Sequence, residues 1–161
     1  MFKREASILS KREASILSSS LHDQDSFYRA FLDDLRKARR QVIIESPFIT
    51  IHRTNKLIRV LRILCNAGVE VIVNTKPPEE LDTHMAHQAN SAIVEFQAMG
   101  IKVLYTTGHH RKLAIVDGMI TWEGSLNILS QNDSCELMRR IDSKQISEQM
   151  LSFINIHKFV A

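Results

Sequence analysis

The chain has 161 residues, of which 44% are hydrophobic and 24% charged, a balance that excludes a disordered, collagen-like or rod-shaped chain. The net charge of +3 permits a polyanionic partner without requiring one. No apolar run reaches the roughly 20 residues that span a bilayer, and the first residues include an acid with no apolar run behind it. We therefore expect a cytoplasmic protein with no membrane partner.

The first feature along the chain is a perfect tandem repeat. The octapeptide at 3–10 recurs at 11–18, and two more serines follow Ser18. Eight residues advance about 80° beyond whole helical turns, so the two Ile-Leu pairs do not share one stripe of a helix. We interpret residues 1–20 as a duplicated, partly helical leader that ends in a serine hinge, or alternatively as a connector to a partner or a further domain. Residues 21–161 are then one domain.

Helices and strands alternate after the leader. Apolar spacing, caps and glycine stops predict helices at 23–40, 55–66 and 83–99, with strands at 41–46, 69–74 and 101–105. The strand at 69–74 is almost continuously apolar, which is typical of a strand covered on both faces. This alternation predicts a parallel core with right-handed crossovers.

The pattern changes after Gly108. Short strands are predicted at 112–116 and 119–122, on either side of the hairpin signal Asp117-Gly118, and a further strand is predicted at 135–140. A final helix begins near Ser143, and its predicted inward side is Ile146, Met150, Phe153, Ile154 and His157. Together the elements predict an α/β fold, a mixed, largely parallel sheet sandwiched by helices on both faces.

Four polar side chains in the second half of the chain are expected to converge. His110 and Lys112 are two residues apart at the entrance to a strand, so they point to the same side. The second arm of the hairpin brings Ser125 and Asn127 back towards that entrance. An imidazole, an ammonium, a hydroxyl and a carboxamide suit a transferring phosphoryl group. His110 by itself would be an ordinary surface or core histidine, but its spacing to the other residues favours a site.

The run His-x-Lys-x4-Asp-x6-Gly-Ser-x-Asn, at residues 110–127, resembles the HKD signature of the phospholipase D superfamily. Residue type and spacing agree throughout. The resemblance extends more weakly from Gln41 to the C-terminus and leaves only the first forty residues outside it. It implies that the fold is phospholipase D-like.

The resemblance also implies catalytic roles. His110 would attack phosphorus to form a covalent phosphohistidine. Lys112 and Asn127 would hold the non-bridging oxygens, and Ser125 would assist. The family's mechanism needs no metal or other cofactor, because lysine and histidine provide the positive charge that Mg²⁺ supplies elsewhere.

Two acids accompany the motif. Glu136 stands where family members carry an acid, and it would hydrogen-bond the far ring nitrogen of His110 and fix its orientation. Asp117 would brace the strand end and the neighbouring loop, although either acid could orient the imidazole. A simple surface ion pair with Arg139 or Arg140 is the alternative for Glu136.

Basic residues near the motif are candidate substrate contacts. Arg111 lies between the two motif residues of the strand entrance. Arg53 and Lys56, together with Arg59 and Arg62, are spaced along one face of a predicted helix. This face could track phosphates beside the site, or it could simply be a solvated helix surface.

The family places two such motifs in each active site, and this chain contains one. The only other candidate, Ile51-His52-Arg53-Thr54, lacks the lysine and the Gly-Ser-x-Asn segment. A two-fold homodimer through the active-site face would supply the second histidine. The short chain is similar in this respect to the compact bacterial endonucleases of the superfamily.

These arguments predict a metal-independent phosphodiesterase that acts on DNA, an endonuclease with little sequence preference, with RNA left open as a substrate. One alternative is a non-catalytic nucleic-acid-binding module of a larger helicase- or restriction-type system. Another is a phospholipid hydrolase, which predicts a large exposed apolar or aromatic rim. Aromatic residues make up only 6% of the chain, and no such rim is evident in the sequence.

Overall fold

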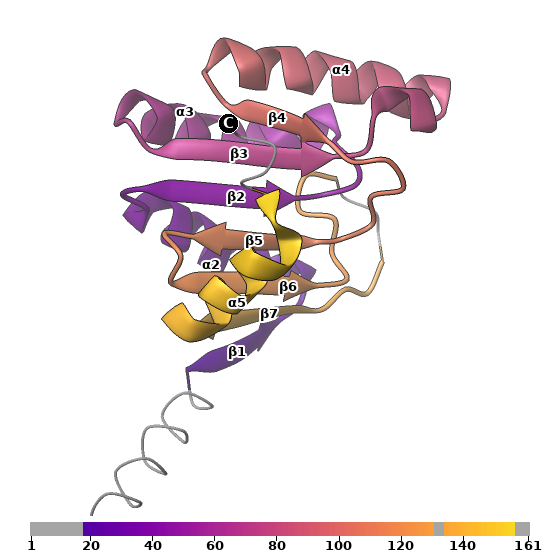
Figure 1. The fold of residues 1–161 in the computed structure, drawn as a ribbon. Coiled ribbons are helices and arrows are strands. Elements are labelled where there is room, and N and C mark those ends of the chain that lie inside the picture. The colour runs from indigo at the N-terminus through magenta and orange to yellow at the C-terminus, as the bar shows by residue number, and fades with distance from the viewer. Residues whose placement is uncertain (1–17, 131–133, 157–161) are drawn as a thin grey trace, which may run out of the picture.

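The computed structural model describes residues 18–130 and 134–156, in which one seven-stranded sheet carries helices on both faces (Figure 1). In chain order the elements are β1 (Ser19–His22), α2 (Gln24–Lys37), β2 (Gln41–Glu45), α3 (Ile51–Asn66), β3 (Glu70–Thr75), the 3-10 helix η1 (Pro78–Glu80), α4 (Thr83–Ala98), β4 (Lys102–Tyr105), β5 (Leu113–Val116), β6 (Ile120–Gly124), β7 (Met138–Asp142) and α5 (Lys144–Ile154). Of the predicted leader, residues 1–20, positions 1–17 lie outside the described residues.

The strand order is β1-β7-β6-β5-β2-β3-β4. Strands β2, β3 and β4 are parallel, and the other four pairings are antiparallel. The predicted mixed α/β sheet is confirmed, but it is not largely parallel. Parallel pairs form only where a helical crossover joins the strands, as between β2 and β3 and between β3 and β4. Strands β5 and β6 are joined by a tight hairpin, and adjacent strands joined in this way run antiparallel.

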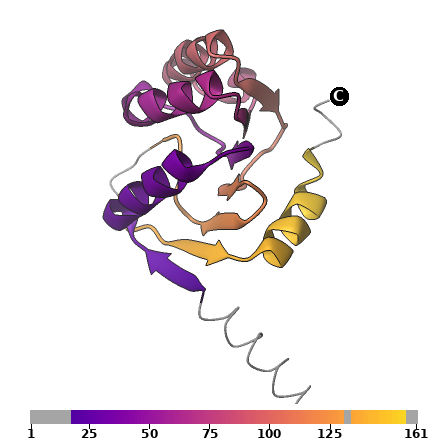
Figure 2. The same ribbon diagram turned by 90° about the vertical axis from the view of Figure 1, so that its left-hand side faces the viewer.

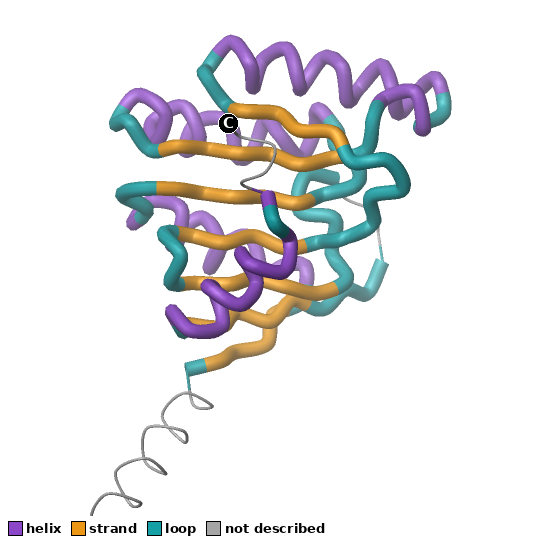
Figure 3. Tube along the Cα trace, in the orientation of Figure 1, coloured by secondary structure: helices purple, strands orange, loops and turns teal. Residues whose placement is uncertain are grey.

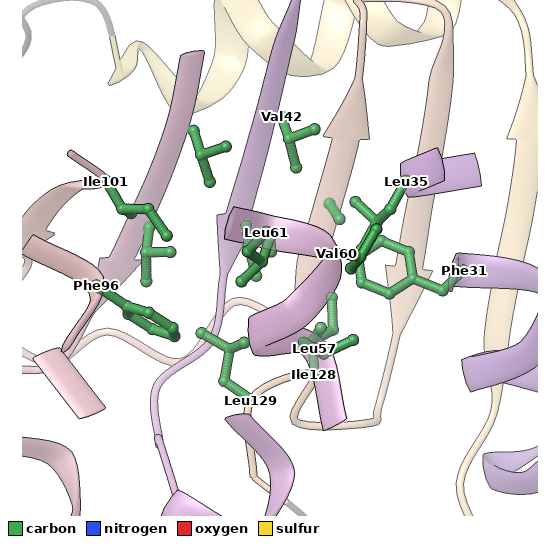
Figure 4. Packing of buried hydrophobic residues seen from close by; sticks show 14 of the residues in the cluster. Phe31, Leu35, Val42, Leu57, Val60, Leu61, Phe96, Ile101, Ile128 and Leu129 are labelled. Atoms are coloured by element: carbon green, nitrogen blue, oxygen red, sulfur yellow. The ribbon is translucent and has the colours of Figure 1, made fainter. Parts of the chain in front are cut away.

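The sheet separates two hydrophobic layers, and both were predicted. Helices α2, α3 and α4 cover one face and α5 covers the other (Figure 2). Side chains of β2 alternate accordingly, with Val42 and Ile44 in the larger layer and Ile43 in the layer under α5. In the larger layer, Leu61 and Phe96 lie over the parallel strands (Figure 4). None of the helices among the described residues is both long and apolar enough to cross a membrane.

The inward side of α5 differs from the prediction at one aromatic residue. Met150, Leu151 and Ile154 pack against the sheet, whereas Phe153 is 77% exposed. At about 100° per residue, Met150, Ile154 and Leu151 span an arc of about 100°, and Phe153 lies about 60° outside it. His157 lies outside the described residues.

The serine run near the N-terminus forms part of the sheet. Ser19 and Ser20 pair with Ile141 and Arg140 of β7, and the hydroxyl of Ser18 donates to the carbonyl of Asp142 at 2.9 Å. The predicted serine hinge is therefore wrong, because the edge of β7 offers unpaired backbone groups that an extended segment can satisfy.

Candidate active site

Several loops meet at one end of the sheet (Figure 3). Strand β2 has two neighbours: β3 runs parallel to β2, and β5 runs antiparallel to β2. The carboxyl ends of β2 and β3 therefore share an edge with the amino end of β5, where residues 110–112 lie. Strand β6 is antiparallel to β5, so the segment after Gly124 also begins at this edge. This topology places both arms of the motif beside the carboxyl ends of β2 and β3.

Lys112 and His110 contact each other at this edge. The Lys112 ammonium nitrogen lies 3.1 Å from Nδ1 of His110 and 3.0 Å from its carbonyl oxygen. Burial lowers the pKa of Lys112; the charge of Glu136 opposes this shift, and the charge of Lys76 adds to it. His110 itself is exposed. The arrangement therefore presents an imidazole to solvent beside a half-buried cation.

Ser125 and Glu136 form the second part of the cluster. The Ser125 hydroxyl donates a short hydrogen bond to Glu136, and the Ser134 hydroxyl donates to the same carboxylate at 2.5 Å. These two bonds lower the pKa of Glu136, as does the charge of Lys112. Within the described parts of the chain, the carboxylate makes no hydrogen bond to His110. Its role in orienting that ring therefore stays a prediction, while its contact with Ser125 is part of the structure.

Gly124 determines how closely Ser125 approaches β7. A Cβ atom on Gly124 would lie 2.1 Å from the carbonyl oxygen of Leu137 and 2.9 Å from Cα of Met138. Only glycine permits this approach, in which the Ser125 amide donates to the Leu137 carbonyl at 2.9 Å. The glycine of the motif thus has a steric role that positions the serine.

Asn127 supplies an amide whose oxygen lacks a partner. Its Oδ1 atom is buried and accepts no hydrogen bond from the described residues. Its backbone carbonyl accepts from the Ser130 amide at 3.0 Å, which fixes the turn after the motif. Buried polar atoms without partners are uncommon, and they are expected at sites that bind polar ligands.

Asp117 lies at the opposite end of β5 from His110. Its carboxylate accepts hydrogen bonds from the backbone amides of Arg39, Arg40 and Gln41 at 2.8 to 3.0 Å. It therefore braces the connection from α2 to β2, and the alternative in which it orients His110 is wrong. The strand predicted at 112–116 already separates the two residues, but the amides that Asp117 binds come from a distant segment that the motif spacing could not show.

Two of the predicted substrate contacts lie on α3. Arg53 is only 3% exposed, and its guanidinium carbon lies 3.5 Å from the ring centroid of Tyr28 in α2. Helix α3 begins at Ile51, earlier than predicted. Lys56 is exposed and lines a groove of about 420 Å³ between α2 and α3, together with Arg59. No motif residue lines this groove, and the contacts of Arg53 and Lys56 with a substrate stay predictions.

Arg111 is held by a carboxylate that the sequence analysis did not single out. Its Nε and Nη2 atoms donate to Glu45 at 2.5 and 2.9 Å, and Asn74 donates to the same carboxylate at 2.9 Å. Thr106 donates to Asn74 at 3.0 Å and extends this network. Arg111 therefore helps to position the loop, and its contact with a substrate stays a prediction. The available signal was an acid that ends the apolar run of β2.

Comparison with known protein families identifies the family of this chain. A family model described as cardiolipin synthase, PLD-like domain, matches residues 31–156. The chain belongs to the PLD-like family. No curated protein sequence matches it.

Solved structures share this PLD-like fold. The phospholipase D family member Nuc from Salmonella typhimurium is 16% identical, with a TM-score of 0.70 over 84% of this chain and 90% of its own. NucT from Helicobacter pylori is 18% identical, with a TM-score of 0.68 over 84% and 91%. The archaeal chromatin protein TrmBL2, described as having a novel mode of DNA binding, is 12% identical, with a TM-score of 0.60 over 99% and 63%.

Two lysines and one glutamate carry the charges nearest to the PLD-like motif. Lys112 and Lys76 lie close enough for their charges to interact, and Glu136 is the nearby carboxylate. Across residues 18–130 and 134–156, no three His, Cys, Asp or Glu side chains cluster in a way that could hold a metal ion. The site offers one exposed imidazole and neighbouring ammonium groups, a set that fits a phosphodiester.

Proposed function

We propose that this PLD-like chain is a metal-independent phosphodiesterase that hydrolyses DNA through a phosphohistidine on His110. The supporting observation is the contact between the exposed imidazole of His110 and the Lys112 ammonium, 3.1 Å apart at the loop edge of the sheet. A cation beside the nucleophile can hold the non-bridging phosphate oxygens during attack. The amide of Asn127 adds a neutral donor.

The reaction proceeds in two displacements. A ring nitrogen of His110 attacks phosphorus, and a P–N bond forms as the bond to the leaving oxygen breaks. The leaving oxygen takes a proton from the equivalent histidine of a second copy. That histidine then removes a proton from water, which attacks phosphorus, and the P–N electron pair returns to His110 as the phosphomonoester leaves.

Glu136 acts on this reaction through its neighbours. It accepts from the Ser125 hydroxyl, and its charge favours the protonated form of Lys112. The charge keeps the Lys112 ammonium available to a phosphate oxygen, and the hydrogen bond holds the Ser125 side chain in place. A direct bond to His110 would add control of the ring's tautomer.

A homodimer through the active-site face completes the site. The sequence carries one motif, and the mechanism requires two histidines. The exposure of His110 is compatible with a partner histidine across a two-fold axis. The endonuclease proposal, with little sequence preference, rests on the resemblance to compact bacterial endonucleases of the superfamily and on the DNA binding described for TrmBL2.

The test is cleavage of labelled single-stranded and duplex DNA in EDTA, combined with the mass of the protein in solution. We expect His110→Asn to lose cleavage while it retains the fold and the dimer. His87→Asn, which changes an exposed histidine of α4, is the matched control and should keep wild-type activity. Acid quenching should trap phosphate on histidine in the wild-type protein only.

Unchanged cleavage in His110→Asn, or activity abolished by EDTA, would contradict the proposal. The matching family model is described as a cardiolipin synthase domain, so phosphatidylcholine vesicles form a parallel substrate arm. Turnover of lipid without cleavage of DNA would replace the proposed substrate. Binding of DNA by a protein without turnover would indicate a non-catalytic module.

A further inference from the structure

Phe48 and Lys76 lie together at the active-site end of the sheet. Phe48 follows β2 and Lys76 immediately follows β3, and these strands are neighbours. The Lys76 ammonium nitrogen lies 5.1 Å from the centroid of the Phe48 ring, within the range of a cation–π contact. Both side chains are half-buried and so retain exposed surface. Neither belongs to the sequence motif.

Hydrogen bonds fix the loop that carries Phe48. The Ser46 hydroxyl donates to the Phe48 carbonyl at 3.0 Å and accepts from the Leu129 amide at 3.2 Å. The Thr75 hydroxyl donates to the Pro47 carbonyl at 3.4 Å and joins the ends of the two strands. The aromatic ring is therefore presented from a rigid base, which reduces the entropy lost when it binds a ligand.

The same contacts connect this pair to the motif. Leu129, which binds Ser46, is two residues after Asn127. On the other side, the charge of Lys76 acts on Lys112. The loop that carries Phe48 therefore contacts the segment that follows Asn127, and Lys76 lies near enough to Lys112 for their charges to interact.

We propose that Phe48 and Lys76 form a nucleotide subsite that takes an unpaired base and its phosphate, which gives the enzyme a preference for single-stranded DNA. An aromatic ring stacks on any base, and a neighbouring cation binds the backbone. The flexible stem of Lys76 lets its ammonium leave the ring for a phosphate. A paired base is already stacked in its duplex and cannot offer its face. This inference rests on the proposed function, because it assigns the strand state of that substrate.

A tryptophan at position 48 reports base stacking directly. The only native tryptophan, Trp122, is fully buried and gives a constant background. The test protein carries His110→Asn and Phe48→Trp. A twelve-residue oligo(dT) should quench the fluorescence of the new tryptophan. This fluorescence should not be quenched by an abasic strand with the same number of phosphates, and a duplex of equal length should bind at least about tenfold more weakly. Phe153→Trp, at an exposed position of α5, is the control, and its fluorescence should not be quenched by any of the three.

Three further variants test the two components separately. Phe48→Ala should weaken oligo(dT) binding about tenfold or more, and Phe48→Tyr should restore it. Lys76→Met should reduce the slope of log affinity against log salt by about 0.7, the value for one phosphate on a single strand. A thermal melt of each variant checks that the fold is retained.

Equal quenching by the abasic strand or by the duplex would overturn the subsite. So would an unchanged affinity in Phe48→Ala together with an unchanged salt slope in Lys76→Met. Cleavage by the wild-type protein is scored separately from these binding measurements. Cleavage without base-dependent quenching refutes this inference alone, whereas base-dependent quenching without cleavage refutes the proposed function and leaves the subsite supported.

Discussion

The fully buried carboxylate of Glu45 holds the guanidinium of Arg111 through two hydrogen bonds, at 2.5 Å to Nε and 2.9 Å to Nη2. Arg111 lies between His110 and Lys112, so this ion pair fixes the backbone just before β5 to the interior of the sheet. Side chains alternate along an extended chain, and an inward Arg111 directs both neighbours outward. The ion pair therefore links the core of the sheet to the exposed imidazole.

Arg111→Ala should destabilise the protein by about 3 kcal/mol, because it leaves the buried charge of Glu45 without its cation. The midpoint of urea unfolding measures this loss. Lys102→Ala breaks the exposed ion pair with Glu70 and should cost less than about 1 kcal/mol. Similar losses of unfolding free energy in both variants would show that the buried Glu45 pair contributes no more to stability than an exposed ion pair.

Glu136→Gln should move the alkaline decline of cleavage to lower pH. The Glu136 charge raises the pKa of Lys112 against the lowering effect of burial, so its removal lets that pKa fall further. Lys112 must carry its proton to hold the phosphate, and activity is then lost earlier as pH rises. The pH profile of kcat/KM measures the shift, with Glu148→Gln on α5 as control. A shift to higher pH in Glu136→Gln would contradict the role given to Lys112.

Asp117→Asn should weaken the acid dependence of stability. Partial burial raises the pKa of Asp117, but the amides of Gln41, Arg40 and Arg39 together lower it below its ordinary value. A depressed folded pKa contributes stability that is present above the unfolded value of about 3.9 and is lost as pH falls through the folded value.

The Asp117→Asn variant should lose about 1 kcal/mol at neutral pH, roughly one net hydrogen bond, and should differ less from the wild type near pH 3. Urea unfolding between pH 3 and 7 measures both effects. Asp33→Asn, which changes an exposed carboxylate paired with Arg36, is the control. A constant difference across this pH range would contradict the assignment.

Gly124→Ala should lower both stability and activity. The added Cβ meets backbone atoms of Leu137 and Met138, which cannot move without separating β6 from β7. Overpacking of this kind costs about 1–3 kcal/mol. Ser125→Ala removes the hydroxyl without adding volume, so its stability loss should be smaller. Thermal melts of both variants make the comparison, and an unchanged Gly124→Ala melting temperature would refute the steric role.

Local patterns were sufficient to predict most elements of the fold. The apolar spacing of α2 and the nearly continuous apolar run of β3 depend on neighbours in sequence, and both elements formed within a few residues of their predicted bounds. The spacing of His110, Lys112, Ser125 and Asn127 likewise predicted that their segments would meet, since a hairpin brings its two arms together. The prediction was weaker at helix ends, and α3 begins four residues early. Positions three apart drift by about 60° around a helix, so Arg53 lies on the opposite side from Arg62.

The sequence by itself determined the alternation of elements and the residues of the motif, because side-chain periodicity and turn chemistry act over a few positions. Only the tertiary structure decided the contacts between distant segments. It joined Asp117 to the backbone amide of Arg40, paired Arg111 with Glu45, and brought Phe48 beside Lys76. Each of these relationships depends on which strands become neighbours, and that choice is made by the packing of whole helices against the sheet.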